Sequence, residues 1–261
     1  MPYADVAAAR LYYEDCGAGE ALLLIHGIGA SAEDWEGQIP EFAARYRVVA
    51  PDLRGYGRSQ RKGPFSIQRF AQDCWALLDR LGIQRCCIVG HSLGGAVALQ
   101  MAVDQPQRVE RLVVTDSLPS FRPDSARKWG LFFYRLIMMF LFGPKRLSAA
   151  VSARLFPAPE QAALRQRVAM RNGRNSRWVY LRTIPRVVRW SVTDRLAELR
   201  MPTLILAAEF DYFPVEEAVR FAGAIPAARL DIMQGLHHSA PIEAPARFNP
   251  LVLDFLAARR L

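Results

Sequence analysis

The stretch Gly90-His91-Ser92-Leu93-Gly94-Gly95 decides the fold, because it joins two elements of different kind through a very tight turn. The apolar run 86–89 before it has the composition of a buried strand, and the run 96–102 after it has a helical pattern. Glycine at 90 and 94 removes the side chains that would collide in such a turn. The pattern predicts a serine hydroxyl raised above a sheet, with a helix N-terminus aimed at it.

Short apolar runs and helical patterns alternate along the rest of the chain. Runs bounded by Gly, Pro or Asp predict buried strands at 22–25, 47–50, 86–89, 112–114, 203–208 and 229–233. Helical patterns lie at 67–81, 93–103, 215–224 and 249–259. The alternating stretch 3–15 predicts one or two antiparallel edge strands. The sequence therefore predicts an α/β protein with a mostly parallel, doubly wound sheet of about eight strands.

A serine hydroxyl needs a base to take its proton before it can act as a nucleophile, and histidine is the usual base. Two of the four histidines, His237 and His238, follow the last predicted strand. That loop would lie at the same carboxyl edge of the sheet as Ser92. The base needs a carboxylate behind it. Asp211 follows the fifth predicted strand and is preferred, while Asp116 follows the fourth and is the alternative.

The segment 118–199 breaks the alternation, since it offers only helical patterns between two core strands. It predicts a helical insertion after the sixth strand, when two edge strands within 3–15 are counted before the apolar runs. The core is then formed by 1–117 and 200–261. Its apolar stretch 131–142 is shorter than the roughly 20 residues that a membrane span needs. The segment carries 16 basic and four acidic side chains. This charge suits a solvated face, an anionic substrate or a weak contact with an anionic membrane surface.

Composition excludes several classes of function. The cysteines are predicted to be reduced structural thiols; they are Cys16, Cys74, Cys86 and Cys87. The start of the chain predicts a cytoplasmic protein. No spacing of Cys and His suits a metal, and the phosphate-loop and dinucleotide patterns are absent, so no metal or cofactor is expected. The net charge of +9 comes without a nucleic-acid-binding motif, which makes nucleic acid an unexpected partner.

Taken together, these motifs resemble the α/β-hydrolase fold family over nearly the whole chain. The resemblance is carried by the stretches 26–29, 52–59, 90–95, 194–196, 201–203, 211–214 and 238–245. It implies Asp211 as the acid, His238 as the base, and an oxyanion hole formed by the backbone N–H groups of Ile28 and Leu93. The family commonly has glycine where His237 stands, so His237 remains the alternative base. The segment 118–199 then corresponds to the family's helical cap domain.

The expected function is that of a serine hydrolase. It would cleave a small carboxylic ester, or a related acyl compound, that carries an apolar group, through an acyl-enzyme on Ser92. Hydrolysis of a C–C bond in a diketone, of a lactone or of a thioester would use the same residues. A non-catalytic ligand-binding protein or an anionic-membrane-surface protein on this fold is the alternative of another class. The sequence leaves monomer and homodimer both open.

Overall fold

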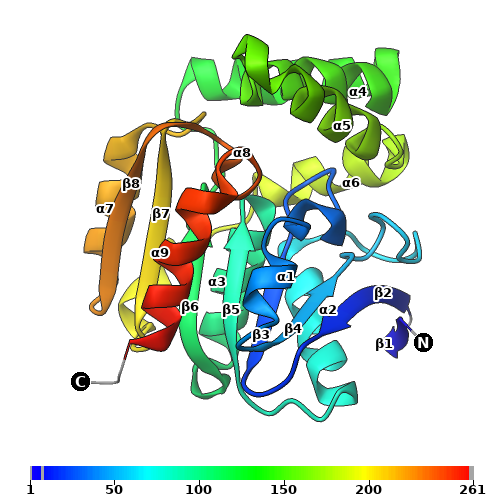
Figure 1. The fold of residues 1–261 in the computed structure, drawn as a ribbon. Coiled ribbons are helices and arrows are strands. Elements are labelled where there is room, and N and C mark those ends of the chain that lie inside the picture. Colours follow the sequence, from blue (N-terminus) through cyan, green and yellow to red (C-terminus); the bar gives the residue numbers. More distant parts are fainter. Residues whose placement is uncertain (1, 7–8, 259–261) are drawn as a thin grey trace.

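The computed structural model describes residues 2–6 and 9–258, and a single mixed sheet forms its centre (Figure 1). The strand order is β1-β2-β4-β3-β5-β6-β7-β8. The strands are β1 (Tyr3–Val6), β2 (Ala9–Cys16), β3 (Ala21–Ile25), β4 (Arg47–Pro51), β5 (Cys86–His91), β6 (Val109–Thr115), β7 (Thr203–Phe210) and β8 (Ala228–His237). β1 pairs with β2, and β2 with β4, in antiparallel fashion, and all other neighbours pair parallel. The predicted doubly wound sheet with an antiparallel edge is confirmed.

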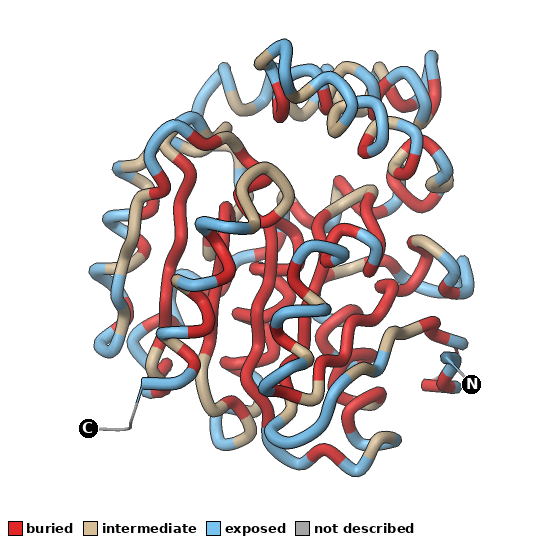
Figure 2. The backbone as a smooth tube through the Cα atoms, viewed as in Figure 1, coloured by how far each residue is buried: buried red, intermediate tan, exposed pale blue. Residues whose placement is uncertain are grey.

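Helices cover both faces of the sheet, as the apolar strands require. The core helices are α1 (Ile39–Phe42), α2 (Ile67–Arg80), α3 (Leu93–Asp104), α7 (Val215–Gly223), α8 (Ala240–Glu243) and α9 (Pro245–Ala257), with the 3-10 turns η1 (Ala32–Trp35) and η2 (Pro106–Arg108). Leu23 and Ile88 pack with α2 and α3, whereas Leu22 and Val89 pack with α1 and α9. Figure 2 shows the resulting buried centre. Each central strand is therefore apolar on both sides.

Several elements differ from the sequence prediction at their ends. α9 begins at Pro245, four residues before the predicted start, because proline suits the first turn of a helix. Its predicted end, Arg259, lies outside the described residues. The short elements η1, α1 and α8 were not predicted, because one turn of helix carries no apolar period. Cys86 and Cys87 point to opposite faces of the sheet, as predicted, and the part of the chain that the structure describes contains no disulfide.

A helical cap lies over the carboxyl edge of the sheet, between β6 and β7 (Figure 1). It contains α4 (Ala126–Leu155), η3 (Pro159–Gln161), α5 (Ala162–Asn172), α6 (Arg177–Val187) and η4 (Thr193–Glu198). The two ends of this insertion lie side by side, since Ser120 and Ser191 form an isolated antiparallel bridge. The domain boundaries at 117/118 and 199/200 remain predictions.

The first cap helix is longer than its apolar stretch suggested. α4 has 30 residues and is, by length and composition, the one described helix that could cross a membrane. Gly143 interrupts it with a left-handed φ of 74°, and Pro144 follows. Because a proline in a helix removes a hydrogen bond, α4 consists of two helical halves that meet at a kink.

A buried ion pair holds the loop after β4, and replacing one of its two side chains is expected to cause a large loss of stability. Arg54 and Asp73 are each about 1% exposed and form two bonds of 2.6 Å, from Nε and from Nη2. Arg54→Leu should lower the free energy of unfolding by about 3–5 kcal/mol, because Asp73 stays buried with its main partner gone. Urea unfolding measures this loss.

Two further variants make that measurement specific. Arg54→Leu with Asp73→Leu should recover much of the loss, since neither member of the buried pair is then left without the other. Arg47 forms a similar pair with Asp15, but at 32% and 28% side-chain exposure, so Arg47→Leu should cost only about 0–1 kcal/mol. Equal losses for Arg54→Leu and Arg47→Leu would contradict the role given to burial.

A second stability prediction concerns the tight turn after β5. A Cβ atom on Gly94 would lie 2.0 Å from the Ile25 carbonyl oxygen. Because backbone atoms cannot give way easily, Gly94→Ala should lower the free energy of unfolding by about 3 kcal/mol or more. Gly130, an exposed residue of α4 with nothing within 4 Å of its Cβ, is the matched control. Gly130→Ala should raise stability by about 1 kcal/mol, and a rise for both variants would contradict the turn geometry.

Candidate active site

Ser92 lies between β5 and α3 in a strained conformation, as the flanking glycines predicted. Its φ and ψ are 53° and −117°, which only a well-supported turn tolerates. The N–H of Ser92 donates to the Thr115 carbonyl at 3.0 Å, and the Ser117 hydroxyl donates to the Ser92 carbonyl at 2.7 Å. A Cβ atom on Gly90 would lie 2.3 Å from the Gly94 carbonyl oxygen. The backbone of β6 therefore holds the serine in place.

The structure brings three predicted residues into one hydrogen-bonded chain. Nε2 of His238 lies 2.9 Å from Oγ of Ser92, and Nδ1 of His238 lies 2.6 Å from Oδ1 of Asp211. A carboxylate oxygen can only accept, so Nδ1 carries a proton and Nε2 is free to accept the serine proton. The arrangement can deprotonate Ser92 and stabilise the charge that then forms on His238.

Aromatic rings surround the His238 imidazole. The rings of Tyr212 and Phe213 lie 4.7 and 5.5 Å from it, centroid to centroid. His91 lies 5.5 Å away, and its Nε2–H donates to the His238 carbonyl at 2.8 Å. Burial and the neighbouring His238 lower the pKa of His91 to about 3, so its ring is neutral at pH 7. His91 supports the loop of His238 and does not contact Ser92 as a base.

The alternative acid, Asp116, has another place in the structure. It is fully buried, and its Oδ1 accepts from the Ala208 N–H at 2.9 Å while its Oδ2 accepts from the Ala240 N–H at 3.2 Å. Burial and the nearby charge of Asp211 raise the pKa of Asp116 to about 7. Asp116 therefore joins the end of β7 to the start of α8, and the carboxylate that accepts a hydrogen bond from His238 is that of Asp211.

The alternative base, His237, faces away from the serine. Its Nδ1 lies 3.0 Å from Oε1 of Glu243, and its backbone N–H donates to Oε2 of the same side chain at 2.6 Å. Its ring packs against Phe210. The glutamate thus shapes the loop that presents His238, and the sequence analysis did not single it out.

Two backbone N–H groups point to an oxyanion hole beside Ser92. Within residues 2–6 and 9–258, neither the Ile28 nor the Leu93 N–H donates a hydrogen bond to the protein. Leu93 is the first residue of α3, where the N–H has no partner within the helix. Both residues line a cavity that Ser92 also lines. Their assignment as oxyanion donors remains a prediction.

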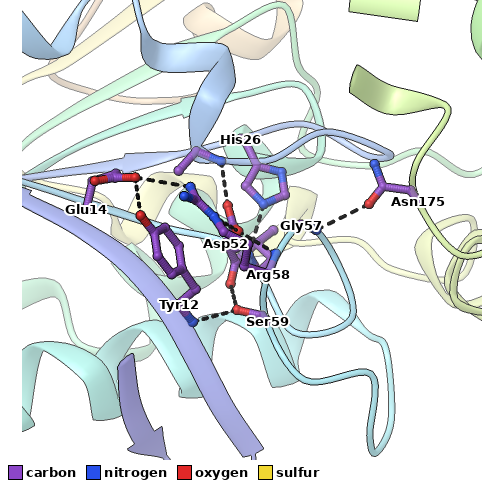
Figure 3. Close-up of polar contacts among 10 residues, drawn as sticks. Tyr12, Glu14, His26, Asp52, Gly57, Arg58, Ser59 and Asn175 are labelled. Carbon is purple, nitrogen blue, oxygen red and sulfur yellow. Dashed lines mark hydrogen bonds and ion pairs between the residues drawn. The ribbon is translucent and has the colours of Figure 1, made fainter. Parts of the chain in front are cut away.

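Polar contacts of Asp52, Arg58 and Ser59 hold the loop 52–59 (Figure 3). The Asp52 carboxylate accepts from the N–H groups of Ala32 and Arg58, each at 2.7 Å. Nε2 of His26 accepts from the Leu53 N–H at 2.9 Å, so His26 holds the start of this loop. In the cap, Asn175 donates to the Gly29 carbonyl at 2.6 Å. The cap is thereby tied to the segment that carries Ile28.

Two cavities meet at Ser92 and His238, beneath the cap. One of about 80 Å³ includes polar lining residues such as Asp34, Asn172 and Asn175. The other, of about 140 Å³, is lined chiefly by apolar side chains of the core and cap: Leu118, Phe121, Leu131, Phe132, Ile184, Val187, Val188 and Phe213. Arg135 and Tyr212 line both cavities, and sequence reasoning missed them. The apolar cavity suits an alkyl or aryl group.

Comparison with known proteins agrees with this architecture. The family model described as alpha/beta hydrolase fold matches residues 20–245. The chain is 33% identical to "Putative carbamate hydrolase RutD" of Azorhizobium caulinodans, over 98% of each chain. It is 31% identical to the 2-hydroxymuconate semialdehyde hydrolase of Pseudomonas sp. strain CF600, over 96% of this chain and 92% of that one.

A solved structure gives the same result in three dimensions. The thermophilic esterase from Thermogutta terrifontis superimposes with a TM-score of 0.88 and 26% identity, over 98% of both chains. The fold of the chain, the position of its cap and the matching family model agree with one another. The chain belongs to the α/β-hydrolase fold family, and it is an α/β-hydrolase enzyme.

Proposed function

We propose that this enzyme hydrolyses a carboxylic ester, or a related acyl compound, that carries an apolar group. The observation that carries the proposal is the hydrogen-bonded chain Ser92–His238–Asp211, which lies where the two cavities meet. The apolar lining of the larger cavity supports a substrate with an alkyl or aryl group. No cofactor is needed for this chemistry.

The reaction would proceed in two steps. Nε2 of His238 takes the Ser92 proton while Oγ attacks the acyl carbon, and Asp211 stabilises the imidazolium that forms. The N–H groups of Ile28 and Leu93 would bind the developing oxyanion. His238 then gives its proton to the leaving alcohol, which leaves an acyl group on Ser92. A water molecule deprotonated by His238 attacks that group, so that the acid departs and the serine hydroxyl is restored.

Other acyl substrates fit the same residues. Lactone and thioester hydrolysis follow the same two steps. One relative is named a putative carbamate hydrolase, which adds a carbamate to the candidates. Hydrolysis of a C–C bond in a diketone stays an alternative, as the sequence analysis stated. The proposal prefers an ester because ester hydrolysis needs only the residues already described.

A substrate panel and a covalent probe test the proposal together. The enzyme is assayed with 4-nitrophenyl esters from acetate to palmitate, a lactone, a thioester and a diketone, and is treated with an alkyl 4-nitrophenyl phosphonate. We expect ester turnover and one phosphonate adduct on Ser92 by peptide mass spectrometry. Ser152→Ala, which changes a buried cap serine outside both cavities, should retain the adduct. An adduct without ester turnover would favour another acyl substrate. The absence of both the adduct and the turnover would favour a non-catalytic ligand-binding protein.

We also propose a weak contact between the cap and an anionic membrane surface. One face of α4 exposes large apolar side chains at helical spacing: Trp129, Phe133, Ile137, Phe140 and Leu141, each 43–60% exposed. Exposed basic residues, Arg127, Lys145 and Arg146, lie near the two ends of this stretch. An apolar face flanked by positive charge is typical of helices that lie on anionic lipid.

Vesicle sedimentation tests this second proposal. The protein should bind vesicles rich in phosphatidylglycerol and should bind phosphatidylcholine vesicles weakly, with binding that falls as salt rises. Ile137→Glu with Phe140→Glu should abolish binding, because it places charge on the apolar face. If the protein forms a dimer that these substitutions dissociate and binds neither vesicle, the face is an interface between two copies.

A further inference from the structure

The cap places one cation at the junction of the two cavities. Arg135 projects from the first half of α4 and lines both cavities together with Ser92 and His238. Its Cζ atom lies 5.1 Å from the centroid of the Tyr212 ring, and that ring lies 4.7 Å from the His238 ring, centroid to centroid. A group bound by Arg135 would therefore lie close to the base of the reaction.

This guanidinium has no acidic partner in the described part of the chain. Salt bridges there neutralise other cap cations, such as Lys128 with Asp124 and Arg171 with Asp34, and none involves Arg135. Asp34 lines the smaller cavity too, but Arg171 already holds it at 2.6 Å. Arginine stays protonated in proteins, so the positive charge at this junction is uncompensated.

A second polar group lies at the same place. The Tyr212 hydroxyl is buried and lies within reach of the Arg135 guanidinium. A phenol oxygen that faces a guanidinium still has its own proton to donate to a bound acceptor. An anion between Arg135 and Tyr212 would satisfy both groups at once, because a carboxylate accepts from a guanidinium and from a phenol.

We propose that Arg135, with the Tyr212 hydroxyl, binds a carboxylate of the substrate, so that the enzyme selects acyl compounds that carry a negative charge. This inference rests on the proposed hydrolase function and narrows its substrate class. The scissile acyl group would lie at Ser92, the carboxylate at Arg135, and the remaining apolar part in the larger cavity. Arg154 also lies near the Tyr212 ring, at 5.5 Å, but it is exposed and lines neither of these two cavities.

The kinetic test compares two esters of equal length. They are 4-nitrophenyl butyrate, which is neutral, and mono-4-nitrophenyl succinate, which carries a carboxylate. The native enzyme should have the higher kcat/KM for the succinate. Arg135→Met should lower the ratio of the succinate value to the butyrate value by about 10–100-fold, since the charged hydrogen bond to the carboxylate is lost while the apolar cavity remains. Equal loss for both esters would mean that Arg135 only supports the cap, and would overturn the proposal.

Control variants separate a specific site from the general charge of the cap. Arg182→Met removes an exposed cap arginine that lines neither cavity, and it should leave the succinate preference unchanged. Arg135→Lys should keep part of that preference, because a point charge replaces a planar fork. If Arg182→Met reduces the preference as much as Arg135→Met, the effect is long-range attraction and the carboxylate site is refuted.

A binding measurement keeps this inference distinct from the proposed hydrolysis. Calorimetry with glutarate, and with uncharged glutaramide as the control, is carried out on Ser92→Ala and on Ser92→Ala with Arg135→Met. We expect glutarate binding that is lost with Arg135 and no binding of glutaramide. Glutarate binding without ester turnover would support the anion site and contradict the esterase. Ester turnover without a preference for succinate and without glutarate binding would overturn the anion site alone.

Discussion

Ser92→Ala is expected to lower kcat for a 4-nitrophenyl ester by at least about 10⁴-fold, because the variant has no nucleophile to form the acyl-enzyme. KM should change little, since the two cavities that bind the substrate remain. Initial rates at several concentrations of 4-nitrophenyl butyrate separate kcat from KM. Residual turnover near the uncatalysed rate agrees with the assignment, because oxyanion donors alone still accelerate hydrolysis slightly.

The same variant offers a structural control. The Ser92 hydroxyl bonds only the His238 ring, whereas the strained turn is held by backbone bonds of Ser92 to Thr115 and Ser117. Ser92→Ala should therefore unfold in urea within about 1 kcal/mol of the native enzyme. Equal ester turnover by a folded variant and the native enzyme would show that another residue is the nucleophile.

Asp211→Asn is expected to lower kcat by about 10³–10⁴-fold, because an amide cannot stabilise the imidazolium form of His238. Asp116→Asn tests the competing assignment, since Asp116 is also buried and lies close enough to Asp211 to feel its charge. The asparagine can accept only one of the two N–H bonds, from Ala208 and Ala240, that the carboxylate accepts. Its main effect should be a loss of stability of about 1–3 kcal/mol.

The pH profile distinguishes the two aspartates further. Burial and the charge of Asp211 raise the pKa of Asp116 to about 7, well above the unfolded value of 3.8. The native state then binds this proton more tightly, so the free energy of unfolding falls as pH rises from about 4 to 7. This contribution should vanish in Asp116→Asn and should persist in reduced form in Asp211→Asn, where burial still raises the pKa of Asp116 but the charge of Asp211 is gone. A greater loss of kcat in Asp116→Asn than in Asp211→Asn would exchange the two assignments.

The sequence was most informative where one short segment controls the local backbone. Gly90 and Gly94 around Ser92 predict the turn, and the position of His238 and Asp211 after two neighbouring strands predicts that all three meet at one sheet edge. The central strands were predictable because both faces of each are buried, which gives continuous apolar runs.

The cap was less predictable because its contacts join distant residues. Arg135 and Tyr212 are 77 positions apart, and their neighbours in sequence are ordinary for a helix and a loop. The kink at Gly143 depends on a left-handed φ that the pair Gly143-Pro144 permits but does not require. Asp116 was a reasonable alternative acid, and only the positions of the Ala208 and Ala240 N–H groups show its other partners.

The paired ends of the cap have a consequence for how such a protein can diversify. The segment leaves the core and returns to it at adjacent points, where Ser120 and Ser191 bridge. Ser92, Asp211 and His238 all lie on core strands or the loops after them, whereas Arg135 comes from the inserted segment. If the proposed roles are correct, the reacting groups and the cation that selects the substrate come from different stretches of the chain. A different insert joined at the same two points could redirect the enzyme to new compounds without rebuilding its reactive centre.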